Sequence, residues 1–90
     1  MFVAVGLDLS SSDHKQRVEL LLSQYGFKRM QEGLFEHTSI TENQLKRLKR
    51  DLDNTTDYYD RIRIYQYPLE NTLVISSLKN KKWTKLIARL

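Results

Sequence analysis

The stretch that decides the fold is residues 2–9, FVAVGLDL. Its apolar side chains are nearly continuous, and only Asp8 interrupts them before Leu9. A short apolar run of this kind is typical of a β-strand that is buried on both faces. Both sets of alternating side chains therefore need cover, either from the rest of the chain or from a second molecule.

The sequence around this strand predicts two helices and four further strands. The first helix follows several serine N-caps, carries an i, i+3, i+4, i+7 apolar face and stops at Gly26. The second begins at Thr41 in a capping box with Gln44, beside the hydrophobic staple of Ile40 and Leu45. The further strands are predicted over residues 27–31, 34–38, 61–67 and 72–78.

The order β-α-β-β-α-β with an added strand predicts an α+β fold of the ferredoxin-like type. We expect a polar loop over residues 53–57 and a strand end at Pro68. In this fold both helices cover one face of an antiparallel sheet, so the other face needs different cover. We therefore expect a homodimer packed through the sheet face.

Asp8 is the residue with the clearest chemical potential. If Val3 and Val5 face the helices, Asp8 faces the partner, and a two-fold axis near this strand brings two Asp8 carboxylates together. Such a pair shares a proton or binds a hard divalent cation such as Mg²⁺. The structural alternative is that Asp8 caps the following turn, accepting from backbone N–H groups near Ser10 or Ser11.

The composition excludes several kinds of site. The chain has 90 residues and no cysteine, which excludes disulfides, thiolate nucleophiles and cysteine-based metal sites. His14 and His37 are isolated in the sequence, so no His-rich metal cluster is predicted. The apolar N-terminal run is too short for a signal peptide or a membrane span, and we expect a single cytoplasmic domain.

The positive charge is concentrated at one end of the chain. The net charge is +4, but residues 79–90 hold five basic and no acidic side chains, which leaves residues 1–78 at −1. We expect a domain over residues 1–78 and a basic amphipathic tail over residues 79–90. Trp83, Leu86, Ile87 and Leu90 have helical spacing. The tail fits a helix docked on its own domain, a phosphate-binding arm or, as we favour, a segment that docks on a partner protein.

Of the three other groups of basic residues, two are candidates for binding nucleic acid. Lys15 and Arg17 lie in the first turns of the first helix, where the helix N-terminus favours phosphate; the alternative is a solvated helix face. The strand over residues 61–67 carries Arg and Tyr side chains on one face, which fits a single-strand binder or a subunit interface. The basic residues of the second helix are expected to be solvated and balanced by Glu42, Asp51 and Asp53.

These residues together resemble the CRISPR-associated protein two family, the small subunit of the CRISPR spacer-acquisition machinery. The resemblance covers residues 1–78. It lies in the strand that contains Asp8, in the R-x-Q-x-x-x-F-E stretch of residues 29–36 and in the R-I-Y strand of residues 63–65.

The resemblance implies a ferredoxin-like homodimer that bridges two dimers of the CRISPR integrase and holds duplex DNA by its backbone. It also implies that Asp8 binds Mg²⁺ at the dimer interface and is catalytic in those members that cleave RNA or DNA, and that Lys15 and Arg17 lie beside bound DNA. Two alternatives stay open: a stand-alone Mg²⁺-dependent endoribonuclease of the related toxin type, and a dimerising module without a nucleic-acid role.

Overall fold

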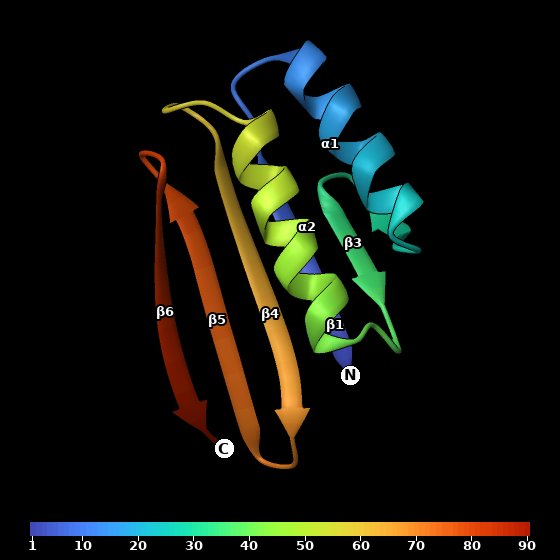
Figure 1. Ribbon diagram of the computed structural model, residues 1–90, viewed down its shortest axis with the longest axis vertical. Helices are drawn as coiled ribbons and strands as arrows, with labels where there is room; N and C mark the ends of the chain where they lie inside the picture. Colours follow the sequence, from blue (N-terminus) through green and yellow to red (C-terminus); the bar gives the residue numbers. More distant parts are fainter.

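The computed structural model describes residues 1–90 as one six-stranded sheet and two helices (Figure 1). The elements, in chain order, are β1 (Phe2–Asp8), α1 (Ser12–Gln24), β2 (Lys28–Gln31), β3 (Leu34–His37), α2 (Glu42–Thr55), β4 (Arg61–Leu69), β5 (Thr72–Lys79) and β6 (Lys82–Arg89). No helix is both long and apolar enough to cross a membrane.

The sheet is antiparallel throughout, in the order β2-β3-β1-β4-β5-β6. Its first four strands and the two helices have the order expected of a ferredoxin-like fold, so the predicted α+β architecture is confirmed. Both helices lie on the same side of the sheet, and β5 and β6 extend beyond them (Figure 1). The opposite face of the sheet has no element of this chain above it.

The core lies between the helices and the central strands. Val3 and Val5 of β1 are fully buried, while the alternate residues Phe2, Ala4 and Gly6 are only half-buried. The leucines of α2, Leu45, Leu48 and Leu52, are buried as their spacing predicts. The two faces of β1 therefore differ: the helices bury one, and within a single chain the other is left partly open.

The local signals at the helix ends act as the sequence predicts. Ser11 is the N-cap of α1, and α2 begins in the capping box of Thr41 and Gln44. Gly26 has a φ of 91°, and the N–H groups of Gly26 and Phe27 donate to carbonyls of the last turn of α1. This pattern ends the helix because a residue in the left-handed region satisfies the otherwise unpaired carbonyls.

Three local expectations are wrong. The helical spacing of residues 83–90 is not used, because Asn80 and Lys81 have φ of 54° and 61° and form a two-residue turn that pairs β6 with β5. Helix α2 continues through most of the expected loop and ends at Thr55. Pro68 does not end β4, since it lies at a register shift where its missing N–H is tolerated.

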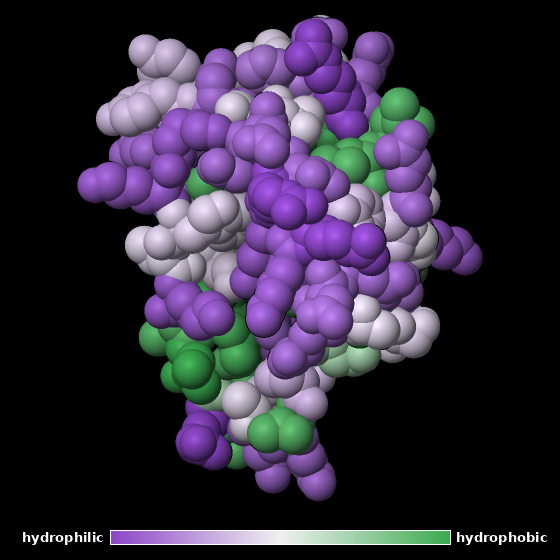
Figure 2. Space-filling view, in the orientation of Figure 1, coloured by the Kyte–Doolittle hydropathy of each residue, from purple (hydrophilic) through white to green (hydrophobic).

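The helical side of the molecule is mainly hydrophilic (Figure 2). Apolar side chains gather there over the lower parts of β5 and β6, beyond the helices (Figure 2). Ile87 of β6, whose register partner is the buried Val74, is 59% exposed. The added hairpin therefore leaves apolar surface at the edge of the sheet.

Candidate functional site

The uncovered face of the sheet is hollowed where β1 ends and β4 begins. The hollow has a volume of about 480 Å³ and is lined by residues that include Asp8, Gly6, Arg61 and Arg63. Asp8 pairs with Arg61 and Gly6 with Arg63, so these residues share one face of the sheet. A Cβ at Gly6 would meet no atom within 4 Å, which places this glycine at open space. The missing side chain therefore contributes to the hollow.

The hollow is strongly basic. Arg61, Arg63 and Lys79 line it, and Asp8 is its one acidic residue. None of the three cations forms an ion pair within the chain. The guanidinium of Arg63 lies 5.4 Å from the centre of the Tyr65 ring, which orients it along the sheet. An excess of unpaired cations around one carboxylate suits an anionic ligand such as a phosphate.

Asp8 itself is exposed and has no ion-pair partner. The backbone N–H of Ser10, which Asp8 was expected to cap, donates to Asp60 over 2.7 Å. The cap on the following turn is therefore made by a different carboxylate, and the structural alternative for Asp8 is wrong. Its side chain is left free for a ligand.

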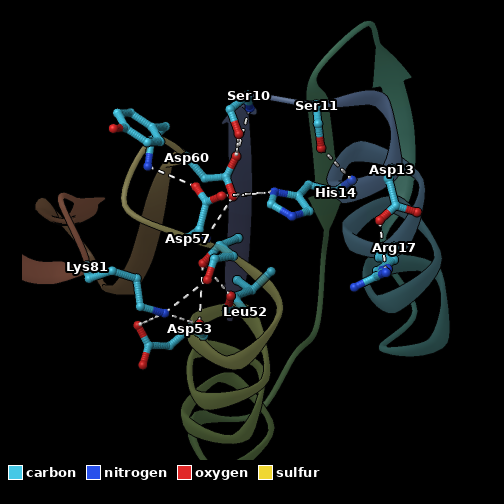
Figure 3. A network of polar contacts seen from close by, with 12 residues as sticks. Ser10, Ser11, Asp13, His14, Arg17, Leu52, Asp53, Asp57, Asp60 and Lys81 are labelled. Atoms are coloured by element: carbon cyan, nitrogen blue, oxygen red, sulfur yellow. Dashed lines mark hydrogen bonds and ion pairs between the residues drawn. The ribbon is translucent and has the colours of Figure 1, made fainter.

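Asp60 lies directly before β4 and is fully buried. One carboxylate oxygen accepts from the backbone N–H and the hydroxyl of Ser10, at 2.7 and 2.8 Å. The other accepts from the Asp57 N–H and from His14 Nδ1, both at 2.8 Å (Figure 3). Asp60 thus ties three segments together: the turn after β1, the start of α1 and the loop before β4.

These hydrogen bonds determine the charge of Asp60. Burial by itself raises the pKa of this carboxyl, but the hydrogen bonds from the backbone of Ser10 and Asp57, and from the side chains of Ser10 and His14, lower it more. The net pKa is below the ordinary value, so Asp60 is ionised at neutral pH and accepts at both oxygens. His14 Nδ1 is therefore the donor in its hydrogen bond with this carboxylate.

Comparison with known proteins decides the family. Residues 1–86 match the family model described as CRISPR associated protein Cas2. The chain belongs to the Cas2 family. No curated protein and no solved structure matches it individually. Membership in the Cas2 family implies a CRISPR-associated function and partners from the CRISPR system.

Two parts of this Cas2-family chain offer ligand atoms to a metal. His14, Asp57 and Asp60 place one ligand atom each within 4.8 Å of one another, a donor set compatible with a divalent cation. The sequence did not point to this group, because His14 is 46 positions from Asp60 in the chain. Both oxygens of Asp60 already accept two hydrogen bonds each, so a metal there would have to displace donors. Asp8 offers an exposed carboxylate with no such competition, which fits a hard, partly hydrated cation such as Mg²⁺.

The two basic residues predicted from α1 have different positions. Lys15 lines a smaller hollow of about 220 Å³ together with Asp8 and Glu32, and forms an ion pair with Glu32. Arg17 lies further along α1 and pairs with Asp13 over 2.9 Å. Both pairs are exposed, and exposed pairs of this kind are weak enough for a ligand to replace. Of these two residues, only Lys15 lines a hollow together with Asp8.

Asp60 and Lys79 are the residues of this region that the sequence did not single out. Asp60 precedes a strand, and a polar residue in that place is ordinary, so its full burial had no sequence signal. The carboxylate accepts from both the N–H and the hydroxyl of Ser10, which fixes the turn after β1. Lys79 belonged to the predicted tail and reaches the hollow because β5 continues through it.

Proposed function

We propose that this Cas2-family protein acts in the cytoplasm as a homodimer, holds duplex DNA by its backbone, and bridges integrase dimers during spacer acquisition. The observation that carries the proposal is the uncovered sheet face, which combines an apolar middle with a basic hollow at one end. In each protomer no element of the same chain covers this face, and a two-fold interface between two copies is the simplest way to cover it.

The apolar middle of the face supports the homodimer. Phe2 and Tyr67 are register partners, their rings are 6.1 Å apart, and Tyr67 is 42% exposed. Ile75 lies beside Tyr65 in the register, and its other neighbour Leu86 is 59% exposed. Apolar side chains on one sheet face bury their surface when a second copy packs on them. Packing near β1 brings the two Asp8 residues to the same interface.

The basic groups around Asp8 support the interaction with DNA. Arg61, Arg63 and Lys15 have no buried carboxylate partner, so each is available to a phosphate oxygen. Arg17 extends this surface along α1 if a phosphate of the DNA backbone replaces Asp13 as its ion-pair partner. Contacts of this kind read the shape and charge of the backbone rather than the base sequence, which is what a spacer-acquisition subunit requires.

A Mg²⁺ ion at Asp8 would supply a water of lowered pKa as the nucleophile for phosphodiester cleavage. The chain's own contribution is to hold the Asp8 carboxylate exposed at the end of β1. Arg61 and Arg63 place positive charge beside it, where a scissile phosphate would lie. These residues support the second candidate function, a stand-alone Mg²⁺-dependent endoribonuclease.

The experiment that separates these functions uses the full chain and the Asp8→Ala variant in two assays. Spacer integration is measured with the cognate integrase, and divalent-dependent cleavage is measured on RNA and DNA. We expect the wild-type chain to stimulate integration and Asp8→Ala to retain that stimulation while losing cleavage. No stimulation by the wild-type chain contradicts the adaptation role, and a monomer at micromolar concentration contradicts the dimer.

The DNA contact has its own test. Lys15→Gln and Arg63→Gln should weaken duplex binding and reduce its salt dependence, because fewer counterions are released on binding. Lys28→Gln, at an exposed lysine of β2 outside both hollows, is the matched control and should bind as the wild-type chain does. Equal weakening in all three variants would mean that binding follows net charge and not this surface.

A further inference from the structure

A second groove lies on the helical side of the sheet, between α2 and the added hairpin. Its volume is about 220 Å³, and it is lined by Lys49 of α2, Ser76 of β5, and Trp83, Thr84 and Lys85 of β6. Ser76 is adjacent to Ser77, which lines the Asp8 hollow, and neighbouring residues of a strand point to opposite faces. The groove and the Asp8 hollow therefore open on opposite sides of the molecule.

Lys49 is held inside this groove by neutral groups alone. Its ammonium donates a hydrogen bond to the hydroxyl of the buried Ser76 over 2.9 Å and lies 5.8 Å from the centre of the Trp83 ring. No carboxylate is within 4.0 Å of its Nζ. Burial, together with the nearby charge of Lys85, lowers the pKa of Lys49.

Two of the three acidic residues expected to balance the charges of α2, Asp51 and Asp53, are engaged elsewhere. Asp53 pairs with Lys81, whose ammonium also donates to carbonyl oxygens at the end of α2. Asp51 accepts a hydrogen bond of 2.6 Å from the hydroxyl of Tyr25. Lys49 and Lys85 thus share one groove with no counter-charge, and the expectation of a balanced, solvated face is wrong at Lys49.

We propose that this groove binds a phosphate group, with Lys49 and Lys85 as its two cationic contacts and Trp83 as its wall. A phosphate offers several acceptor oxygens around one negative centre, so both ammonium groups can donate to it at once. Its negative charge offsets the repulsion between the two lysines. The phosphate comes either from a nucleic-acid backbone or from free inorganic phosphate.

This site goes beyond the proposed function because it needs neither Asp8 nor the dimer face. If the phosphate belongs to DNA, the site is a second contact on the side of the molecule opposite the Asp8 hollow. It also assigns a role to the basic hairpin: Lys81 caps α2, while Lys85 completes a binding groove.

Trp83 is the only tryptophan of the chain, so intrinsic tryptophan fluorescence reports on this groove alone. The full chain is titrated with inorganic phosphate and, separately, with duplex DNA, at an ionic strength kept constant with NaCl. We expect a saturable change in Trp83 fluorescence. Lys49→Gln and Lys85→Gln should each weaken binding about tenfold, the loss of one charge-assisted contact. Lys46→Gln, at an exposed lysine of the same helix outside the groove, should leave binding unchanged.

Two results overturn the proposal: a fluorescence response that NaCl alone reproduces, or variants at Lys49 and Lys85 that bind as the wild-type chain does. The exposed Lys85→Gln keeps the test valid if Lys49→Gln does not fold. Displacement of inorganic phosphate by duplex DNA identifies the backbone as the source, and binding of phosphate without displacement identifies the free ion. The inorganic-phosphate titration uses no residue of the Asp8 hollow, so failure of the proposed integrase role does not affect this result.

Discussion

Asp8 and Asp60 lie at the same end of the sheet, one at the end of β1 and the other directly before the residue that pairs with it. Asp60 is fully buried and accepts four hydrogen bonds, whereas Asp8 is exposed and has no ion-pair partner. Both side chains are carboxylates, but Asp60 is buried among hydrogen-bond donors and Asp8 is exposed to solvent. The comparison shows that the carboxylate that holds the turn is separate from the carboxylate that is free for a ligand, so the site can change without unfolding the chain.

The largest expected effect is that of Asp60→Ala. It removes the acceptor of all four hydrogen bonds from Ser10, Asp57 and His14, and we expect a loss of about 3 kcal/mol in the free energy of unfolding. Urea denaturation measures it. Asp8→Ala is the matched control, and equal losses in the two variants would contradict the separation of roles.

The structural role of Asp60 should also appear in the stability of the fold at acidic pH. The pKa of Asp60 in the folded chain lies below its ordinary value of 3.8, so its ionised form stabilises the fold above about pH 4. That stability is lost as the pH falls through the lowered pKa. Asp60→Asn should therefore show a smaller change in unfolding free energy between about pH 5 and pH 2 than the wild-type chain. If Asp60→Asn lost as much stability in acid as the wild-type chain does, other carboxylates would be responsible for the acid sensitivity.

A smaller effect is expected from His14→Ala. It removes one of the four hydrogen bonds to Asp60 and leaves the backbone donors in place, so we expect a loss of about 1 kcal/mol. Thermal unfolding at neutral pH measures it. If His14, Asp57 and Asp60 held a metal, added Mg²⁺ or Mn²⁺ would stabilise the wild-type chain and leave His14→Ala unchanged, which distinguishes the two roles of this histidine.

The smallest effect on stability is expected from Asp8→Ala, since an exposed carboxylate without partners contributes little; we expect a change below about 0.5 kcal/mol. Its effect on Mg²⁺-dependent cleavage should be complete. Calorimetric titration with Mg²⁺ and a cleavage assay on the same sample measure both properties. A strongly destabilised Asp8→Ala would show that this carboxylate has a structural role after all.

Much of the fold is predictable because its signals are local. The capping box at Thr41, the stop at Gly26 and the leucine face of α2 each depend on residues within a few positions of one another. The hairpin of β6 was missed because the apolar spacing of residues 83–90 also fits a helix. Its strand conformation depends on pairing with β5 and on the positive φ at Asn80 and Lys81, which a helical pattern does not reveal.

The sequence by itself determined the order of the elements from β1 to β5, the buried face of β1 and the family, because all of these follow from residues close together along the chain. Only the tertiary structure decided which carboxylate holds the turn at Ser10, since Asp60 is fifty positions away and its burial has no local signal. It also brought Lys49 and Lys85 into one groove without an acid. Buried charge depends on which distant groups meet, and only the folded chain determines that.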